Sequence, residues 1–144
     1  MTLAGVSAKN FPFVDQPRSR IPTLPDGVAA QHGHLSASIH GLRHAHAAGH
    51  AWEELAAAID ALMADVQKHF EYEELLMERA HYPRLEQHRN QHSSFLRRLI
   101  ALRAECDRRE TELMGVLVEL LEAWFKSHEQ TADRHAMEYL GIEE

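Results

Sequence analysis

The chain has 144 residues, 44% of them hydrophobic and 26% charged, which suffices to bury one core without disulfides. No apolar run is long enough to cross a bilayer, and the opening residues lack the pattern of a secretory signal, so we expect a cytoplasmic protein without a membrane partner. The net charge of −7, without long basic stretches, argues against a nucleic-acid partner. Twelve histidines are the anomaly, because imidazole is a preferred ligand of transition metals.

The first segment, residues 1–26, carries four of the five prolines and is expected to be an extended arm. From Val28 onward, apolar residues recur at spacings of three and four, which is typical of amphipathic helices. We expect helices at 27–47, 51–80, 84–105 and 110–140, joined by short links at 48–50, 81–83 and 106–109. Short links force consecutive helices to run antiparallel. The sequence therefore predicts an all-α, up-down-up-down four-helix bundle over residues 27–144, with Cys106 as a small buried hydrophobe.

Polar residues interrupt the apolar stripe of each helix. The third helix gives the plainest case, with Leu85, His88, His92, Phe95, Leu99 and Leu102 at steps of three and four. Across the four helices, five histidines and two carboxylates face the core: His32, His69, Glu73, His88, His92, His128 and Asp133. We take these seven residues as candidate metal ligands.

The heights of these residues along the bundle agree. A helix rises about 1.5 Å per residue. His32 lies fifteen residues before the expected end of its helix, and His69 lies eighteen after the start of the next. In the same way, His88 precedes the end of the third helix by seventeen residues and His128 follows the start of the fourth by eighteen. All four helices are therefore expected to contribute to one layer.

Burying two carboxylates and five imidazoles together requires a compensating cation, because isolated buried charges are very costly. Imidazole and carboxylate ligands suit iron, zinc, copper or manganese, and the absence of thiolate ligands argues against structural zinc or an iron–sulfur cluster. Seven ligands exceed the need of one ion, which favours two metals bridged by the carboxylates. The alternatives are chance spacing in a histidine-rich chain, and a zinc or purely structural bundle.

The motifs resemble those of the bacterial hemerythrins. The chain has Gln31-His32 followed by Leu35, and then His69-Phe70 followed by Glu73-Glu74 and Met77. It continues with Tyr82-Pro83 followed by His88, His92 and Phe95, and ends with Trp124 followed by His128 and Asp133. The resemblance covers about residues 28–140, in the family's order.

The resemblance implies two iron ions bridged by an oxo or hydroxo group and by two carboxylates. One iron would be held by His88, His92 and His128, the other by His32 and His69, with Glu73 and Asp133 as the bridges. The second iron would keep a position for dioxygen. The implied function is reversible, non-catalytic dioxygen binding for storage, delivery or sensing, and the sequence indicates no particular protein partner.

Five residues are candidates for the oxygen pocket by the same resemblance: Phe70, Met77, Phe95, Trp124 and Glu129. The first four could equally be plain core residues. Glu129 departs from the family, which usually has an apolar residue after the fourth-helix histidine. Its carboxylate could reach the open iron position or deliver protons there, or it could stay solvated at the rim of the bundle. The first possibility favours the alternative function of a di-iron peroxidase, oxidase or nitric-oxide-handling enzyme.

Overall fold

The computed structural model describes residues 27–109 and 111–142. Its elements are α1 (Val28–Ala47), α2 (Trp52–Arg79), α3 (Leu85–Arg109), α4 (Thr111–His128), the π-helix η3 (Glu129–Asp133) and α5 (Arg134–Leu140). The arm expected over residues 1–26 lies outside the described residues. No helix in the described ranges is long and apolar enough to span a membrane.

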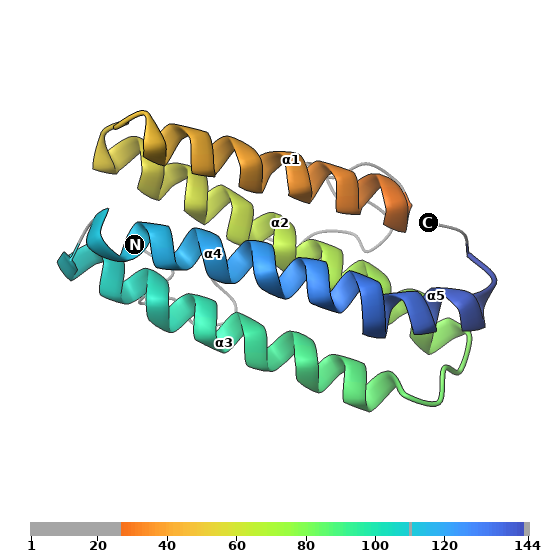
Figure 1. Cartoon of the computed structure of the whole chain (residues 1–144). Coiled ribbons are helices and arrows are strands. Elements are labelled where there is room, and N and C mark those ends of the chain that lie inside the picture. The colour runs from red at the N-terminus through yellow and green to blue at the C-terminus, as the bar shows by residue number, and fades with distance from the viewer. Residues whose placement is uncertain (1–26, 110, 143–144) are drawn as a thin grey trace.

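The four long helices form an antiparallel bundle. Consecutive helices run in opposite directions, and α1 and α3 each pack against both α2 and α4 (Figure 1). This arrangement confirms the all-α, up-down-up-down four-helix bundle.

The link expected at 106–109 is wrong, because α3 continues as helix through Arg109. The cause is Cys106, which is fully buried and extends the apolar stripe of Leu99 by two further turns. Its burial, expected from the sequence, keeps this part of the chain helical and on the core.

The fourth helical segment is not one continuous α-helix. Five residues, Glu129–Asp133, form a π-helix between α4 and α5. In an α-helix, a step of five residues turns the side chain by about 500°, so Asp133 would point about 140° away from His128. The wider π-turn brings both side chains to the inner face of the bundle, and such turns are frequent at functional sites.

The bundle has two apolar clusters on either side of a polar layer. The larger cluster includes Leu35, Ile59, Leu99 and Leu117, each at most 1% exposed. The smaller one contains Val28, Met77, Tyr82, Ala136 and Met137. Along every helix the histidines and carboxylates fall between these two sets, so the polar layer is closed by apolar side chains above and below.

The turns at the two ends differ in their backbone. Gly49, between α1 and α2, has φ 79°, a left-handed conformation that glycine adopts without strain. Between α2 and α3 the left-handed position is occupied by His81, with φ 56°. A residue with a Cβ in this conformation carries a strain of about 1 kcal/mol.

Candidate metal centre

All seven candidate ligands are buried, with exposed fractions between 0% and 8%. The structure brings them together as two groups that share both carboxylates. One group is Glu73, His88, His92, His128 and Asp133; the other is His32, His69, Glu73 and Asp133. Within each group the potential ligand atoms lie within 4.8 Å of one another.

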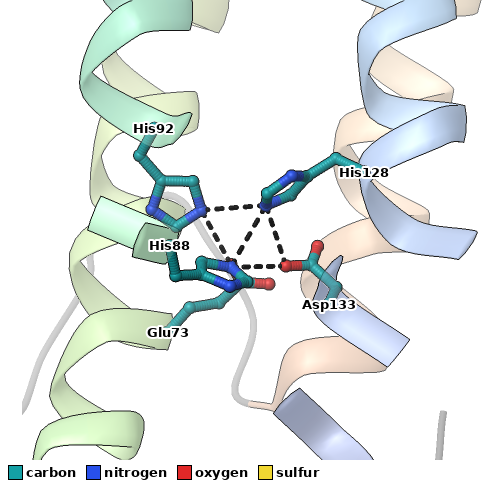
Figure 2. A group of neighbouring side chains, drawn as sticks. All are labelled: Glu73, His88, His92, His128 and Asp133. Atoms are coloured by element: carbon teal, nitrogen blue, oxygen red, sulfur yellow. Dashed lines mark hydrogen bonds and ion pairs between the residues drawn. The ribbon is translucent and has the colours of Figure 1, made fainter. Parts of the chain in front are cut away.

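The first group is built around three imidazoles from α3 and α4 (Figure 2). Nε2 of His128 lies 3.1 Å from Nε2 of His88 and 3.2 Å from Nε2 of His92. About 3.0 Å is also the separation of two nitrogens that bind one metal at a right angle, because each metal–nitrogen bond is about 2.1 Å long. The spacing of this three-histidine group therefore suits a common metal ion.

The second group takes its imidazoles from α1 and α2. The Nε2 atoms of His69 and His32 lie 3.1 Å and 3.3 Å from Oε2 of Glu73. Nε2 of His32 is also 3.3 Å from Oδ2 of Asp133. This two-histidine group has one imidazole fewer than its neighbour.

Each carboxylate divides its two oxygens between the groups. Oε1 of Glu73 faces His92 and His88, at 3.2 and 3.5 Å, whereas Oε2 faces the two-histidine group. Asp133 is also shared between the groups. Its Oδ1 lies 2.8 Å from Nε2 of His88 in the three-histidine group, and its Oδ2 faces His32 in the two-histidine group. The two carboxylates thus stand between the two sets of nitrogens.

Hydrogen bonds at the outer nitrogens turn three of the rings inward. Nδ1–H of His69 donates to Oε1 of Gln31, and Nδ1–H of His92 donates to Oε2 of Glu74, both at 2.7 Å. His32 directs its Nδ1 to Oε2 of Glu129, at 2.9 Å. A partner at Nδ1 leaves the lone pair on Nε2, which is the arrangement expected of a metal-binding histidine.

The charges of the layer are strongly coupled. Burial raises the pKa of Glu73, but neighbouring histidines, His69 first, outweigh it and hold that pKa well below its usual range. Burial and the charge of Glu73 also raise the pKa of Asp133, but hydrogen bonds from the histidines outweigh them and lower that pKa to about 2. Burial lowers the pKa of His32, but hydrogen bonds to carboxylates, Asp133 first, raise it to about 12. Both carboxylates are therefore ionised at neutral pH and attract positive charge.

The donor set fits a bound metal. Two buried atoms of the layer, Nε2 of His69 and Oε1 of Glu73, have ion-pair neighbours but make no well-directed hydrogen bond to any described residue. A buried polar atom left without a hydrogen bond costs about 1–3 kcal/mol. A cation held between the imidazoles and carboxylates would satisfy both atoms, and their nitrogen and oxygen chemistry suits a transition metal.

The aromatic pocket candidates cover the three-histidine group. Phe70 stacks on His92, with ring centroids 3.8 Å apart, and Trp124 stacks on His128 at 4.2 Å. Phe95 in turn stacks on Trp124 at 4.1 Å. The fourth candidate, Met77, belongs to the smaller apolar cluster on the opposite side of the layer. Their role as pocket walls stays a prediction.

Glu129 lies at the rim of the bundle, but its carboxylate is not left to solvent alone. Its side chain is 33% exposed, and its carboxylate pairs with the outer nitrogen of His32. The carboxylate therefore lies behind the ring, while Nε2 of His32 faces Glu73 and Asp133. The π-helix places both Glu129 and Asp133 against the same histidine.

Sequence reasoning missed the orienting residues. Gln31 and Glu74 stand inside the quoted motifs, but neither is on a stripe of candidate ligands. Gln31 could have been found because it is a polar residue next to His32 on the buried side of α1. In the structure its side chain is 1% exposed. None of the other histidines of α1 belongs to a potential metal-binding group among the described residues. His34, for example, pairs with Asp65 at 3.3 Å.

Comparison with known proteins identifies the domain. Residues 23–140 match the model of the hemerythrin HHE cation-binding domain. A bacteriohemerythrin from Ralstonia nicotianae is 33% identical over 81 residues, which span 56% of this chain and 59% of that protein. No solved structure gives a significant match. With a buried metal-binding layer of histidines and carboxylates inside the matched region, this chain belongs to the hemerythrin HHE cation-binding domain family.

Proposed function

We propose that this protein holds two non-haem iron ions in the polar layer and binds dioxygen reversibly, for storage, delivery or sensing. The observation that carries the proposal is the division of each carboxylate between the two histidine groups. A carboxylate whose oxygens face different sets of nitrogens is suited to bridge two cations. One ion alone would leave one of the two sets without a partner.

In this assignment His88, His92 and His128 hold one iron, His32 and His69 hold the other, and Glu73 and Asp133 bridge them. An oxo or hydroxo group is expected as a further bridge. Iron is favoured among the transition metals because the chain belongs to the hemerythrin family and because imidazole and carboxylate are suitable ligands for it. The similar bacteriohemerythrin supports the same choice.

The unequal groups suggest where an external ligand binds. With both bridges counted, the three-histidine group supplies five protein donors and the two-histidine group supplies four. Ferrous iron, when bound, supplies the electrons on which reversible dioxygen binding depends. The residues of the chain position the metals, and the two apolar clusters keep bulk water away from the layer. We expect the protein to act in the cytoplasm, where the lone thiol of Cys106 stays reduced.

A second candidate function is a di-iron peroxidase, oxidase or nitric-oxide-handling enzyme. The observation that favours it is Glu129, a partly exposed carboxylate against His32 of the two-histidine group. Negative charge at that position favours the oxidised metal, which would shorten the lifetime of a reversible complex.

Iron analysis and oxygen cycling test these proposals. The full chain is loaded with ferrous iron without air, its iron content is measured, and its charge-transfer absorption is followed through repeated addition and removal of oxygen. We expect about two irons per chain and a band that appears and disappears without loss. Immediate conversion to the diferric form, with turnover of added peroxide, would support the enzyme instead. An iron content near zero would contradict both.

A further inference from the structure

Glu129 is the outer carboxylate of the two-histidine group. Its Oε2 lies 2.9 Å from Nδ1 of His32, a distance at which the ring nitrogen donates to the carboxylate. His32 is 8% exposed, whereas the Glu129 side chain is 33% exposed. The contact therefore connects a buried ring to a carboxylate at the edge of the bundle.

The other orienting contact in this group is uncharged. His69 is held by the side-chain amide of Gln31, which fixes the ring without adding charge. The three-histidine group has its own outer carboxylate, Glu74, on His92. With Glu129 in place, each group has one outer carboxylate, and the chain carries negative charge behind both sets of ligands.

Other charged groups near Glu129 have different geometry. Glu129 lines a cavity of about 320 Å³ together with Ser36, Ile39, His40, Glu122 and Lys126. No ion pair between Lys126 and Glu129 is found within the described ranges, and Glu122 pairs with Arg43. The carboxylate of Glu129 is therefore directed to His32 and not neutralised by a close cation of the cavity.

We propose that Glu129 is a positioning residue for the metal centre: it fixes His32 with Nε2 toward the metal and lowers the reduction potential of the iron in the two-histidine group. A carboxylate hydrogen-bonded to the outer nitrogen makes the imidazole a stronger electron donor, which stabilises the higher charge of the oxidised metal. This inference rests on the proposed di-iron function.

Replacement of the carboxylate by an amide tests the charge separately from the shape. Glu129→Gln keeps a hydrogen-bond acceptor of the same size, and Glu122→Gln is the matched control, since Glu122 lines the same cavity without contacting a candidate ligand. In the iron-loaded full chain, we expect Glu129→Gln to raise the ratio of reduced to oxidised iron about tenfold at a fixed applied potential. This corresponds to ~59 mV for a one-electron step. The control should stay within twofold of the unmodified chain.

A second measurement does not depend on iron chemistry. In the zinc-loaded chain, nitrogen-15 NMR of the histidine rings should show His32 protonated at Nδ1 and bound through Nε2. The shift of Nδ1 should change in Glu129→Ile and stay unchanged in Glu122→Gln. If the unmodified chain binds two irons but Glu129→Gln and Glu122→Gln have equal potentials, the inference is overturned. If the unmodified chain does not bind two irons, the proposed di-iron function fails. In the NMR experiment, an unchanged His32 signal in Glu129→Ile would refute the positioning role of Glu129.

Discussion

The apolar end of the bundle and its polar layer are made from the same four helices, but burial affects the stability of the fold differently in the two regions. In the apolar end, side chains such as Ile59 and Leu99 are fully buried and belong to the larger apolar cluster. In the polar layer, equally buried positions hold His69 and Glu73. Burial stabilises the fold in the first region and opposes it in the second unless protons on the histidines or a bound metal balance the carboxylates. The fold is therefore held by one region, and metal binding is concentrated in the other.

The largest effect is expected from Glu73→Gln, which removes the charge of a carboxylate shared by both histidine groups. The iron content should fall from about two per chain to one or fewer, because neither metal then has its full set of anionic donors. Far-ultraviolet circular dichroism should show the helices retained. Glu78→Gln, an exposed position on the same helix, is the control and should keep both irons. Full iron content in Glu73→Gln would contradict the bridging assignment.

The opposite result is expected at the apolar end. Leu99→Ala should lower the free energy of unfolding by about 2–5 kcal/mol, because it leaves a cavity in a fully buried site. While the chain is folded, its iron content should remain that of the unmodified protein. Val116→Ala, at a position that is half exposed, should change the free energy of unfolding far less. Urea titrations of the three proteins, paired with iron analysis, check whether stability and metal binding separate in this way.

The polar layer should also release protons when it takes up a metal. In the metal-free chain, the pKa of His32 is raised to about 12 and that of His88 to about 9; burial lowers both, but hydrogen bonds to Asp133 and other carboxylates prevail. Both imidazoles are then protonated at pH 7, and a metal must displace these protons to bind. We expect about two protons released per chain, so that affinity rises with pH from 7 to 9. Calorimetry in buffers of different ionisation enthalpy measures the release, and a value near zero would contradict this charge state.

The smallest effect is expected outside both regions, at the turn between α2 and α3. His81→Gly should raise the free energy of unfolding by about 0.5–1 kcal/mol, because glycine adopts the left-handed conformation without strain. His50→Gly, in a turn residue without positive φ, should bring no gain. Thermal unfolding of both variants, with iron content unchanged in each, tests whether this strain belongs to the fold alone.

Much of this comparison could be predicted from the sequence. The period of apolar residues indicated four helices, and polar residues on the apolar stripes indicated the seven residues that the structure brings together. Counting residues along straight helices worked because the bundle is nearly regular up to His128. It could not reveal the π-helix, since a spacing of five between His128 and Asp133 shows only that a regular α-helix would separate them.

The partners of the outer nitrogens were also beyond the sequence. Which carboxylate contacts His32 depends on side-chain rotation and on the wider turn at Glu129, neither of which follows from helical periodicity. The end of α3 was misplaced for a related reason. A link was expected to begin at Cys106, whereas the burial of that side chain keeps the segment helical through Arg109.

The π-helix holds one residue more than a regular helical turn needs. Deleting one residue between Glu129 and Ala132 would leave four steps between His128 and Asp133, which turn a regular α-helix by about 400°, so Asp133 would still point within about 40° of His128. Ala136 and Met137 would keep their places in the smaller apolar cluster for the same reason. Inserting one further residue would instead rotate all that follows by about 100° and carry Asp133 out of the layer. Relatives that keep the same metal centre should therefore tolerate the loss of one residue in this segment more readily than the gain of one.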